Sequence, residues 1–278
     1  MSEPKRVLYV SSEIFPYMKE SDISIVGRYL PQGAQERGFE IRSFMPKYGI
    51  INERRNQLHE VIRLSGMNII IDDIDRPLII KVSSIPSARM QVYFIDNEDY
   101  FYRKFIYHDS EGRYFDDNDE RALFFAKGVL ETVKKLRWKP DIVHCQGWIS
   151  HLVPIFLRKY YHEDPIFTNC KVIVSLYDNE VNNIDFNDKA RSKLVAAGIK
   201  NKDLDMFSPP NGINLAKLAI QYANGVIMGS KTLPDTISEM IKSNSVPLLP
   251  YIEVSQHDTA YIDEYVEFYD QILRENVK

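Results

Sequence analysis

The strongest constraint on the fold is a short apolar run that is followed by a helical pattern and then by a second apolar run. Residues 7–10 form a short, β-branched run of the kind found in buried parallel strands. Apolar residues then recur at helical spacing over residues 23–34, and Gly38 ends this predicted helix. Residues 39–45 follow as a second strand. Together these segments predict a βαβ unit, in which a helix packs on two parallel strands.

The rest of the chain repeats this alternation, with one interruption. Four strand-like runs separated by turn residues predict an antiparallel excursion from the main sheet, at residues 61–64, 68–71, 78–82 and 90–95. Further helices are expected at residues 118–136, 148–160, 214–222 and 233–242, and further strands at 141–144, 171–176 and 225–228. We therefore predict an α/β fold with a Rossmann-like, doubly wound and mostly parallel sheet.

The chain is expected to form one domain with a tail. Its 278 residues, of which 44% are hydrophobic, suit one large or two small domains with a sizeable core. We assign residues 1–245 to the Rossmann-like domain and residues 246–278 to a linker and an amphipathic helix. Residues 258–273 are expected to pack on the domain, because large apolar side chains recur there at helical spacing: Tyr261, Tyr265, Phe268, Tyr269 and Ile272.

Composition argues against several classes of function. The net charge is −4, whereas nucleic-acid-binding proteins usually carry a basic excess, so no nucleic-acid partner is expected. No apolar run approaches the roughly 20 residues that span a bilayer, and the polar N-terminus does not resemble a signal peptide. Cys145 and Cys170 are expected to be reduced, buried thiols. We predict a cytoplasmic protein with no membrane partner, no metal and no other cofactor, because Cys and His show no metal-ligand spacing.

Candidate binding residues follow the predicted strands, because ligands of open α/β sheets bind beyond the carboxyl ends of the strands. Three loops meet this condition, at residues 11–19, 144–148 and 177–180. They carry side chains that can hydrogen-bond a sugar or pair with a phosphate: Glu13, Lys19, His144, Gln146 and Asp178.

Each of these residues also has a purely structural interpretation. In that interpretation Lys19 is a solvated surface lysine and His144 is a half-buried histidine with satisfied hydrogen bonds. Glu13 then caps a helix or stabilises a loop. The loop after Lys19 continues with Glu20 and Asp22, where phosphate-binding loops normally carry glycines. The sequence thus predicts the scaffold of a phosphate site with altered chemistry.

Five segments in a fixed order carry a family resemblance. They are Val-Leu-Tyr-Val-Ser-Ser-Glu-Ile-Phe-Pro-Tyr-Met-Lys at residues 7–19, Phe-Met-Pro-Lys-Tyr-Gly at 44–49, Asp-Asn-Asp-Glu-Arg at 117–121, Pro-Asp-Ile-Val-His-Cys-Gln-Gly-Trp at 140–148 and Asn-Leu-Ala-Lys at 214–217. With these segments the chain resembles the N-terminal catalytic domain of bacterial glycogen synthases and plant starch synthases, over roughly residues 7–240.

The resemblance implies one half of a GT-B-type glycosyltransferase, in which two Rossmann-type domains enclose the active site. Such enzymes transfer glucose from ADP-glucose or UDP-glucose to an α-1,4-glucan and retain the anomeric configuration. By this resemblance, His144 is a catalytic-loop residue and Gln146 occupies a degenerate catalytic position. The resemblance also implies contacts to the donor phosphate or the acceptor from four residues: Glu13, Lys19, Tyr177 and Asp178.

Departures from the family pattern shape the functional prediction. The family's Lys-x-Gly-Gly-Leu phosphate loop has lost both glycines here and gained Glu20 and Asp22. Gln146 replaces the second histidine of the family's His-x-His-Asp-Trp segment, and glutamine cannot transfer protons near neutral pH. The tail is too short for a second Rossmann domain. We therefore predict a single-domain homologue that is linked to α-1,4-glucan (glycogen) metabolism and lacks autonomous transferase activity.

Two alternatives stay open. The first is an active glucosyltransferase that uses ADP-glucose or UDP-glucose and is completed by a partner chain. The second is a protein–protein interaction module with a vacated site. The expected partners are accordingly an α-glucan or a nucleotide sugar, and a second copy of the chain or a full-length synthase.

Overall fold

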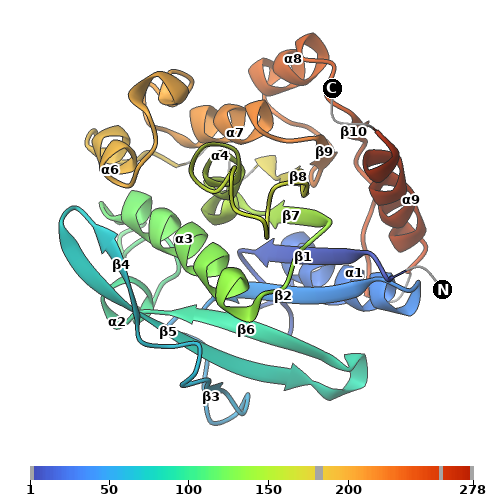
Figure 1. The fold of residues 1–278 in the computed structure, drawn as a ribbon, viewed down its shortest axis with the longest axis horizontal. Helices are drawn as coiled ribbons and strands as arrows, with labels where there is room; N and C mark the ends of the chain where they lie inside the picture. The colour runs from blue at the N-terminus through green and yellow to red at the C-terminus, as the bar shows by residue number, and fades with distance from the viewer. Residues whose placement is uncertain (1–2, 179–183, 257–258, 276–278) are drawn as a thin grey trace.

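A mostly parallel sheet with helices on both faces runs through the molecule (Figure 1). The computed structural model describes residues 3–178, 184–256 and 259–275. The strands are β1 (Arg6–Ser11), β2 (Glu40–Pro46), β3 (His59–Glu60), β4 (Met67–Ile71), β5 (Ile74–Ile85), β6 (Met90–Asp96), β7 (Ile142–Gln146), β8 (Lys171–Leu176), β9 (Gly225–Met228) and β10 (Leu248–Leu249). Their order is β10-β9-β8-β7-β1-β2-β6-β5-β3, and β4 pairs with β5.

Strand direction confirms the predicted fold class. The central strand β1 pairs in parallel with β2 and β7, and β7, β8, β9 and β10 continue in parallel on one side. On the other side β6 is parallel to β2, while β5 is antiparallel to β6, β4 and β3. This is the α/β, Rossmann-like, mostly parallel sheet with an antiparallel excursion that the sequence predicts.

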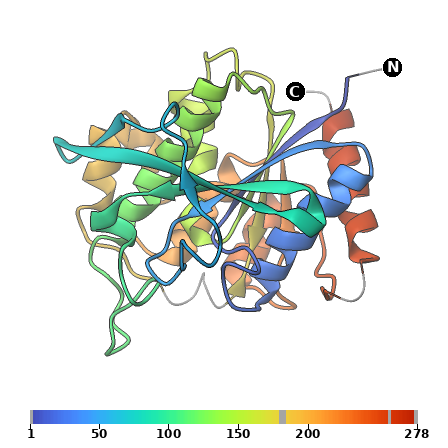
Figure 2. The same cartoon turned by 90° about the horizontal axis from the view of Figure 1, so that it is seen from below.

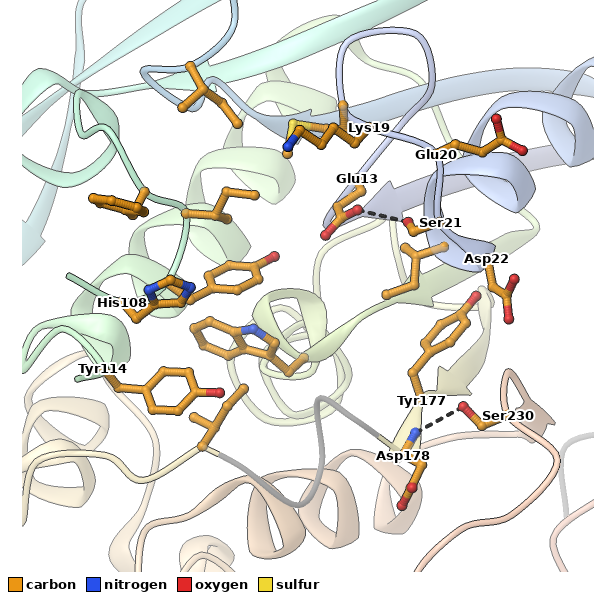
Figure 3. Close-up of a pocket in the computed structure, with 18 of the residues that line it drawn as sticks. Glu13, Lys19, Glu20, Ser21, Asp22, His108, Tyr114, Tyr177, Asp178 and Ser230 are labelled. Carbon is orange, nitrogen blue, oxygen red and sulfur yellow. Dashed lines mark hydrogen bonds between the residues drawn. The ribbon is translucent and has the colours of Figure 1, made fainter. Parts of the chain in front are cut away.

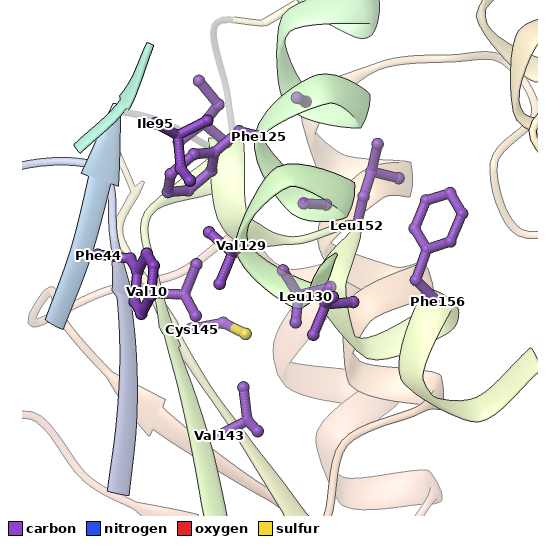
Figure 4. Close-up of a cluster of buried hydrophobic side chains, with 14 of the residues drawn as sticks. Val10, Phe44, Ile95, Phe125, Val129, Leu130, Val143, Cys145, Leu152 and Phe156 are labelled. Atoms are coloured by element: carbon purple, nitrogen blue, oxygen red, sulfur yellow. The ribbon is translucent and has the colours of Figure 1, made fainter. Parts of the chain in front are cut away.

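Helices cover both faces of the sheet. They are α1 (Asp22–Glu36), α2 (Glu98–Phe101), α3 (Asn118–Leu136), α4 (Val153–Ile155), α6 (Ala190–Ala196), α7 (Gly212–Gln221), α8 (Asp235–Ser243) and α9 (Tyr261–Arg274). Figure 2 shows α1 and α9 on one side of the sheet and α3 on the other. One core lies between the sheet and the helices α3, α4, α7 and α8 (Figure 4), and a second lies between the sheet and the pair α1 and α9.

Two predicted elements are wrong. Residues 61–64 form a turn instead of a strand, because Val61 donates one hydrogen bond to the Ile80 carbonyl and the chain then closes on itself through Leu64 N–H to Val61 O. Residues 148–160 do not form one helix. They divide into a 3₁₀ turn (Trp148–Ser150), α4 and a π turn (Phe156–Tyr160), and Pro154 lies in the middle, where it offers no N–H to a continuous helix.

The tail forms the helix α9, which lies against the sheet on the same face as α1. Gly33 in α1 and Gly225 in β9 make this close approach possible. A Cβ atom at Gly33 would lie 2.6 Å from the side chain of Ile262, and one at Gly225 would lie 2.9 Å from those of Phe268 and Ile272. An ion pair of 2.6 Å between Arg37 and Asp263 adds a polar contact at the rim. The boundary that we place at residue 245 stays a prediction, as does any structure at Asp258, which lies outside the described residues.

Two further observations bear on the expectations from composition. Cys145 and Cys170 are both buried and unbridged, as predicted. Within the described ranges, none of the helices combines the length and the apolar character that a membrane crossing requires.

Candidate functional site

A cavity of about 920 Å³ opens at the carboxyl ends of the central strands (Figure 3). Five parts of the chain form most of its wall, namely the loop after β1 with the start of α1, residues 104–114, Trp148 after β7, Tyr177 and Asp178 after β8, and residues 230–232 after β9, and Ile50 and Ile184 complete it. This is the edge of the sheet at which the topology predicts a ligand. The cavity therefore has the position of a binding site in a doubly wound fold.

The start of α1 is capped by its own side chains. Ser21 accepts a hydrogen bond from the Ser24 N–H at 3.2 Å, and Ser24 Oγ accepts one from the Ser21 N–H at 2.9 Å. Ser21 Oγ also donates to Glu13 Oε2 at 2.9 Å. A helix N-terminus binds phosphate through free N–H groups. Here one of them is already paired, and a carboxylate stands beside it.

Glu13 lies in the cavity wall as a half-buried carboxylate. Burial raises the pKa of Glu13 above its ordinary value, and the hydrogen bond from Ser21 acts in the opposite direction. No described cation forms an ion pair with it. Figure 3 shows Glu13 beside Ser21, with His108 and Tyr114 across the cavity. Glu13 thus presents negative charge toward the cavity interior.

The charges of the cavity wall are unbalanced toward the negative. Two lysines, Lys19 and Lys104, line the cavity, and neither forms an ion pair within the described part of the chain. Four carboxylates line it as well: Glu13, Glu20, Asp22 and Asp178. With His108 neutral, the formal charge of the wall is therefore −2. Like charges 4 Å apart repel by about 1 kcal/mol in water and by more near a protein surface, which opposes a diphosphate.

Aromatic side chains form the other side of the cavity. We call five of them the aromatic wall: Phe105, Tyr107, Tyr114, Trp148 and Tyr177. The rings of Tyr107 and Trp148 meet edge to face with centroids 5.0 Å apart. Tyr177 lies flat on Gly229, where a Cβ atom would be 2.4 Å from its ring. Aromatic faces of this kind pack against the apolar faces of sugar rings or against cations.

A buried arginine in α3 holds the segment that carries Phe105 and Tyr107 of the aromatic wall. Arg121 donates from Nε to the Tyr100 carbonyl at 2.8 Å and from Nη2 to the Ile106 carbonyl at 2.6 Å. Its Nη1 donates to Asn118 Oδ1 at 2.6 Å, and Asn118 in turn donates to the Tyr107 carbonyl at 2.9 Å. The conformation of residues 100–107 therefore depends on two residues at the start of α3.

The structure brings four of the predicted site residues together. Glu13, Lys19, Tyr177 and Asp178 all line the cavity, and the Asp178 N–H donates a hydrogen bond of 3.1 Å to Ser230 Oγ. Asn179 and Glu180, which belong to the same predicted loop, lie outside the described residues. The rest of the aromatic wall, apart from Tyr177, is the part that sequence reasoning missed. For Phe105, Tyr107 and Tyr114 the signal was the density of aromatic residues just before the 117–121 segment.

His144 and Gln146 do not line the cavity. His144 is fully buried beneath α9, with Nδ1 2.7 Å from Tyr269 Oη and Nε2 2.7 Å from Ser175 Oγ. Gln146 is equally buried and accepts a hydrogen bond from Ser11 Oγ at 2.6 Å. The structure gives both side chains a packing role, and their catalytic assignment stays a prediction. Among the described residues, no three His, Cys, Asp or Glu side chains gather as a metal site.

Burial of His144 predicts a loss of stability in acid. Burial lowers the pKa of His144 to about 3, whereas an unfolded histidine titrates near 6.5. Between these values the unfolded chain binds a proton that the folded chain does not. The free energy of unfolding should therefore fall as the pH drops through this window, with His144 contributing about 1.4 kcal/mol per pH unit. We expect His144→Gln to reduce the slope of stability against pH between pH 6 and 4 in urea titrations. The same change at exposed His59 is the control, and an equal slope in both variants would contradict the assignment.

Comparison with known proteins finds relatives among glycogen and starch synthases. A family model described as the starch synthase catalytic domain matches residues 6–245. The glycogen synthases of Chlorobium limicola and Chlorobium phaeobacteroides are each 40% identical over 174 residues, which are 62% of this chain and 36% of each relative. The chain thus spans little more than a third of the length of these relatives.

A solved structure shows the same fold. The catalytic domain of starch synthase IV from Arabidopsis thaliana, bound to ADP and acarbose, matches with a TM-score of 0.73 and 18% identity. The match covers 90% of this chain and 52% of that one. At this level of identity the likeness speaks for the fold alone, and it agrees with the prediction of one half of a GT-B-type architecture.

Proposed function

Because the chain belongs to the starch synthase catalytic domain family, we propose that this glycogen-synthase-like domain binds α-1,4-glucan and does not transfer glucose by itself. The observation that carries the proposal is the composition of the cavity, in which an aromatic wall faces a start of α1 that is capped and acidic. An uncharged glucan fits such a cavity better than a nucleotide diphosphate does. A cytoplasmic location belongs to the same proposal.

The lack of autonomous transfer is supported by two sites. At the start of α1, Ser21 and Asp22 stand at the positions of the family's two glycines, which let backbone N–H groups approach phosphate, and Glu20 adds a second acid before them. After β7, Gln146 is bonded to Ser11, and Gly147 has φ 84° and ψ 153°, a conformation that is essentially restricted to glycine. An aspartate, which the family's motif has here, would be strained in this backbone.

Glucan binding is supported by the aromatic wall. Sugar rings present apolar C–H faces that pack on aromatic rings, while their hydroxyl groups need hydrogen-bond partners at the rim. The cavity supplies both, because Glu13, Asp178 and the two lysines line it together with the rings. Its volume of about 920 Å³ lies within the range of 300–1,000 Å³ that is usual for small-molecule sites.

One observation favours the alternative of an active transferase that is completed by a partner chain. Lys19, the residue that the family uses near the diphosphate, lines the cavity and has no ion pair with another described residue. It is therefore available to a phosphate that other groups also bind. By the family resemblance, the donor phosphate can act as the proton acceptor, so Gln146 does not by itself exclude transfer.

Isothermal titration and a transfer assay distinguish these functions. We expect maltoheptaose to bind, ADP and UDP to bind at least tenfold more weakly, and no radiolabel to pass from ADP-glucose or UDP-glucose to glycogen above a boiled control. Transfer by the purified chain would overturn the proposal. Transfer that needs a full-length synthase and disappears in Lys19→Ala would favour the completed enzyme, and a chain that binds none of these ligands would favour the interaction module.

Phe105 tests the role of the aromatic wall. This side chain is 42% exposed, so Phe105→Ala should leave the fold intact while removing one stacking surface. Stacking is worth about 0.5–1.5 kcal/mol, and maltoheptaose affinity should therefore fall roughly threefold to tenfold. Tyr102, 72% exposed and outside the cavity wall, provides the control, because Tyr102→Ala removes a neighbouring aromatic ring. Equal affinities of the two variants would show that glucan does not bind at the aromatic wall.

A further inference from the structure

The half-buried carboxylate of Glu13 has no counter-charge among the described residues. Glu20 and Asp22 are exposed on the rim, and Asp178 is half-buried like Glu13. The hydroxyl of Ser21 donates to one oxygen of Glu13, and no lysine, arginine or histidine of the described chain forms an ion pair with this carboxylate. A carboxylate held away from water without a cation is costly, and its raised pKa reflects the same burial.

The surroundings of Glu13 favour one class of counter-charge. Figure 3 shows His108 and Tyr114 across the cavity from Glu13, and Tyr177 on the same side as Asp22. Aromatic faces carry negative electrostatic potential and attract cations, most strongly where water is excluded. Carboxylates and aromatic rings therefore attract the same kind of group, and the formal charge of −2 on the cavity wall acts in the same direction.

We propose that the cavity prefers an α-glucan derivative that carries a protonated amine, with the ammonium group at Glu13 and the sugar rings on the aromatic wall. A neutral glucan packs on the aromatic wall but leaves Glu13 without a positively charged partner. An amino-substituted glucan supplies that partner through a charge-assisted hydrogen bond. This inference rests on the proposed function only in that both use the same cavity.

The test compares three ligands that share the maltotriose scaffold and differ in the group at C6, which is charged in only one of them. The first is maltotriose in which an amine replaces the 6-hydroxyl group of every ring, so that no register of binding leaves Glu13 without one. The second is the same compound after N-acetylation, and the third is maltotriose. Isothermal titration at pH 7 and low salt should show the amine binding roughly tenfold tighter than its N-acetylated form.

Matched variants locate the preference. Glu13→Gln keeps an acceptor for Ser21 and removes the charge, and we expect the two derivatives to bind this variant with similar affinity. Glu20→Gln removes an equal charge from the exposed rim and should keep at least half of the preference. Thermal unfolding of both variants, measured beside the parent, establishes that they are folded.

The outcomes separate this inference from the proposed function. Equal binding of the amine and its N-acetylated form to the parent chain would overturn the inference, even where maltotriose binds and the proposed function stands. A preference that persists in Glu13→Gln would overturn the assignment to Glu13. Binding of the amine without any binding of maltotriose or maltoheptaose would support the inference and contradict the proposed glucan function.

Discussion

Replacing Tyr269 with alanine is expected to lower the free energy of unfolding by about 3–5 kcal/mol. The ring of Tyr269 is fully buried between α9 and the sheet, with centroids 6.2 Å from Phe39 and 6.4 Å from Tyr9. Its hydroxyl lies 2.7 Å from His144 Nδ1. Truncation leaves a cavity and also removes the partner of a buried histidine, and the two costs add. Urea titration at pH 7 measures the change.

Two variants of the same helix apportion the effect. Tyr269→Phe keeps the packing and removes the hydrogen bond to His144, so about 1–3 kcal/mol should be lost. Glu267→Ala, on the exposed side of α9, should change stability by less than about 0.5 kcal/mol. A loss below about 1 kcal/mol for Tyr269→Ala would show that α9 adds little to the stability of the sheet.

Replacing Arg121 with methionine should weaken both the fold and the cavity. The substitution keeps a long, apolar side chain in place but leaves the carbonyl groups of Tyr100 and Ile106 without their donor. Each buried acceptor that loses its partner costs about 1–3 kcal/mol, so about 2–6 kcal/mol should be lost for the two carbonyl groups. Residues 104–107 would lose the hydrogen bonds that hold them, so maltoheptaose affinity should fall as well. Urea titration measures the loss of stability, and isothermal titration measures the loss of affinity.

Exposed Arg113 is the matched control for this prediction. Its guanidinium pairs locally with Asp109 at the surface, so Arg113→Met should change neither stability nor affinity by more than about 0.5 kcal/mol. Arg121→Lys should lie between parent and Arg121→Met, because one ammonium cannot reach acceptors spread around a planar guanidinium. Full glucan affinity in folded Arg121→Met would mean that other contacts hold the aromatic wall.

Much of the fold could be predicted, because strands and helices with a strong hydrophobic periodicity depend on local sequence. Buried runs such as Lys171–Leu176 and the amphipathic pattern of α9 each have one consistent interpretation. The failures lie where tertiary pairing decides. Residues 61–64 have strand composition, yet β5 leaves room for only the two-residue β3 beside it. The two-residue β10 forms because Leu248 and Leu249 pair with β9, and no local sequence pattern predicts this pairing.

The position of a site residue was predictable where the residue follows the end of a strand. It was less predictable within a strand, where the side chain can point to either face of the sheet. Glu13, Lys19, Tyr177 and Asp178 follow strand ends and therefore reach the cavity. His144 ends the strand predicted at residues 141–144, but it is the middle residue of β7, and alternation along β7 turns it toward α9, as it does Ile142. The direction of that turn depends on which face carries α9, which is a property of the whole fold.

The position of α9 has a consequence for how the protein is made. On the ribosome, β1 emerges early, whereas the helix that covers its residues Val7 and Tyr9 follows about 250 residues later. At roughly 5–20 residues per second, this delay is on the order of ten to fifty seconds. During that time the helix α1 covers part of this face of the sheet, and the apolar surface that α9 buries has no cover from its own chain. The nascent protein should therefore depend on a chaperone until translation reaches Arg274, more than a protein whose core closes in chain order.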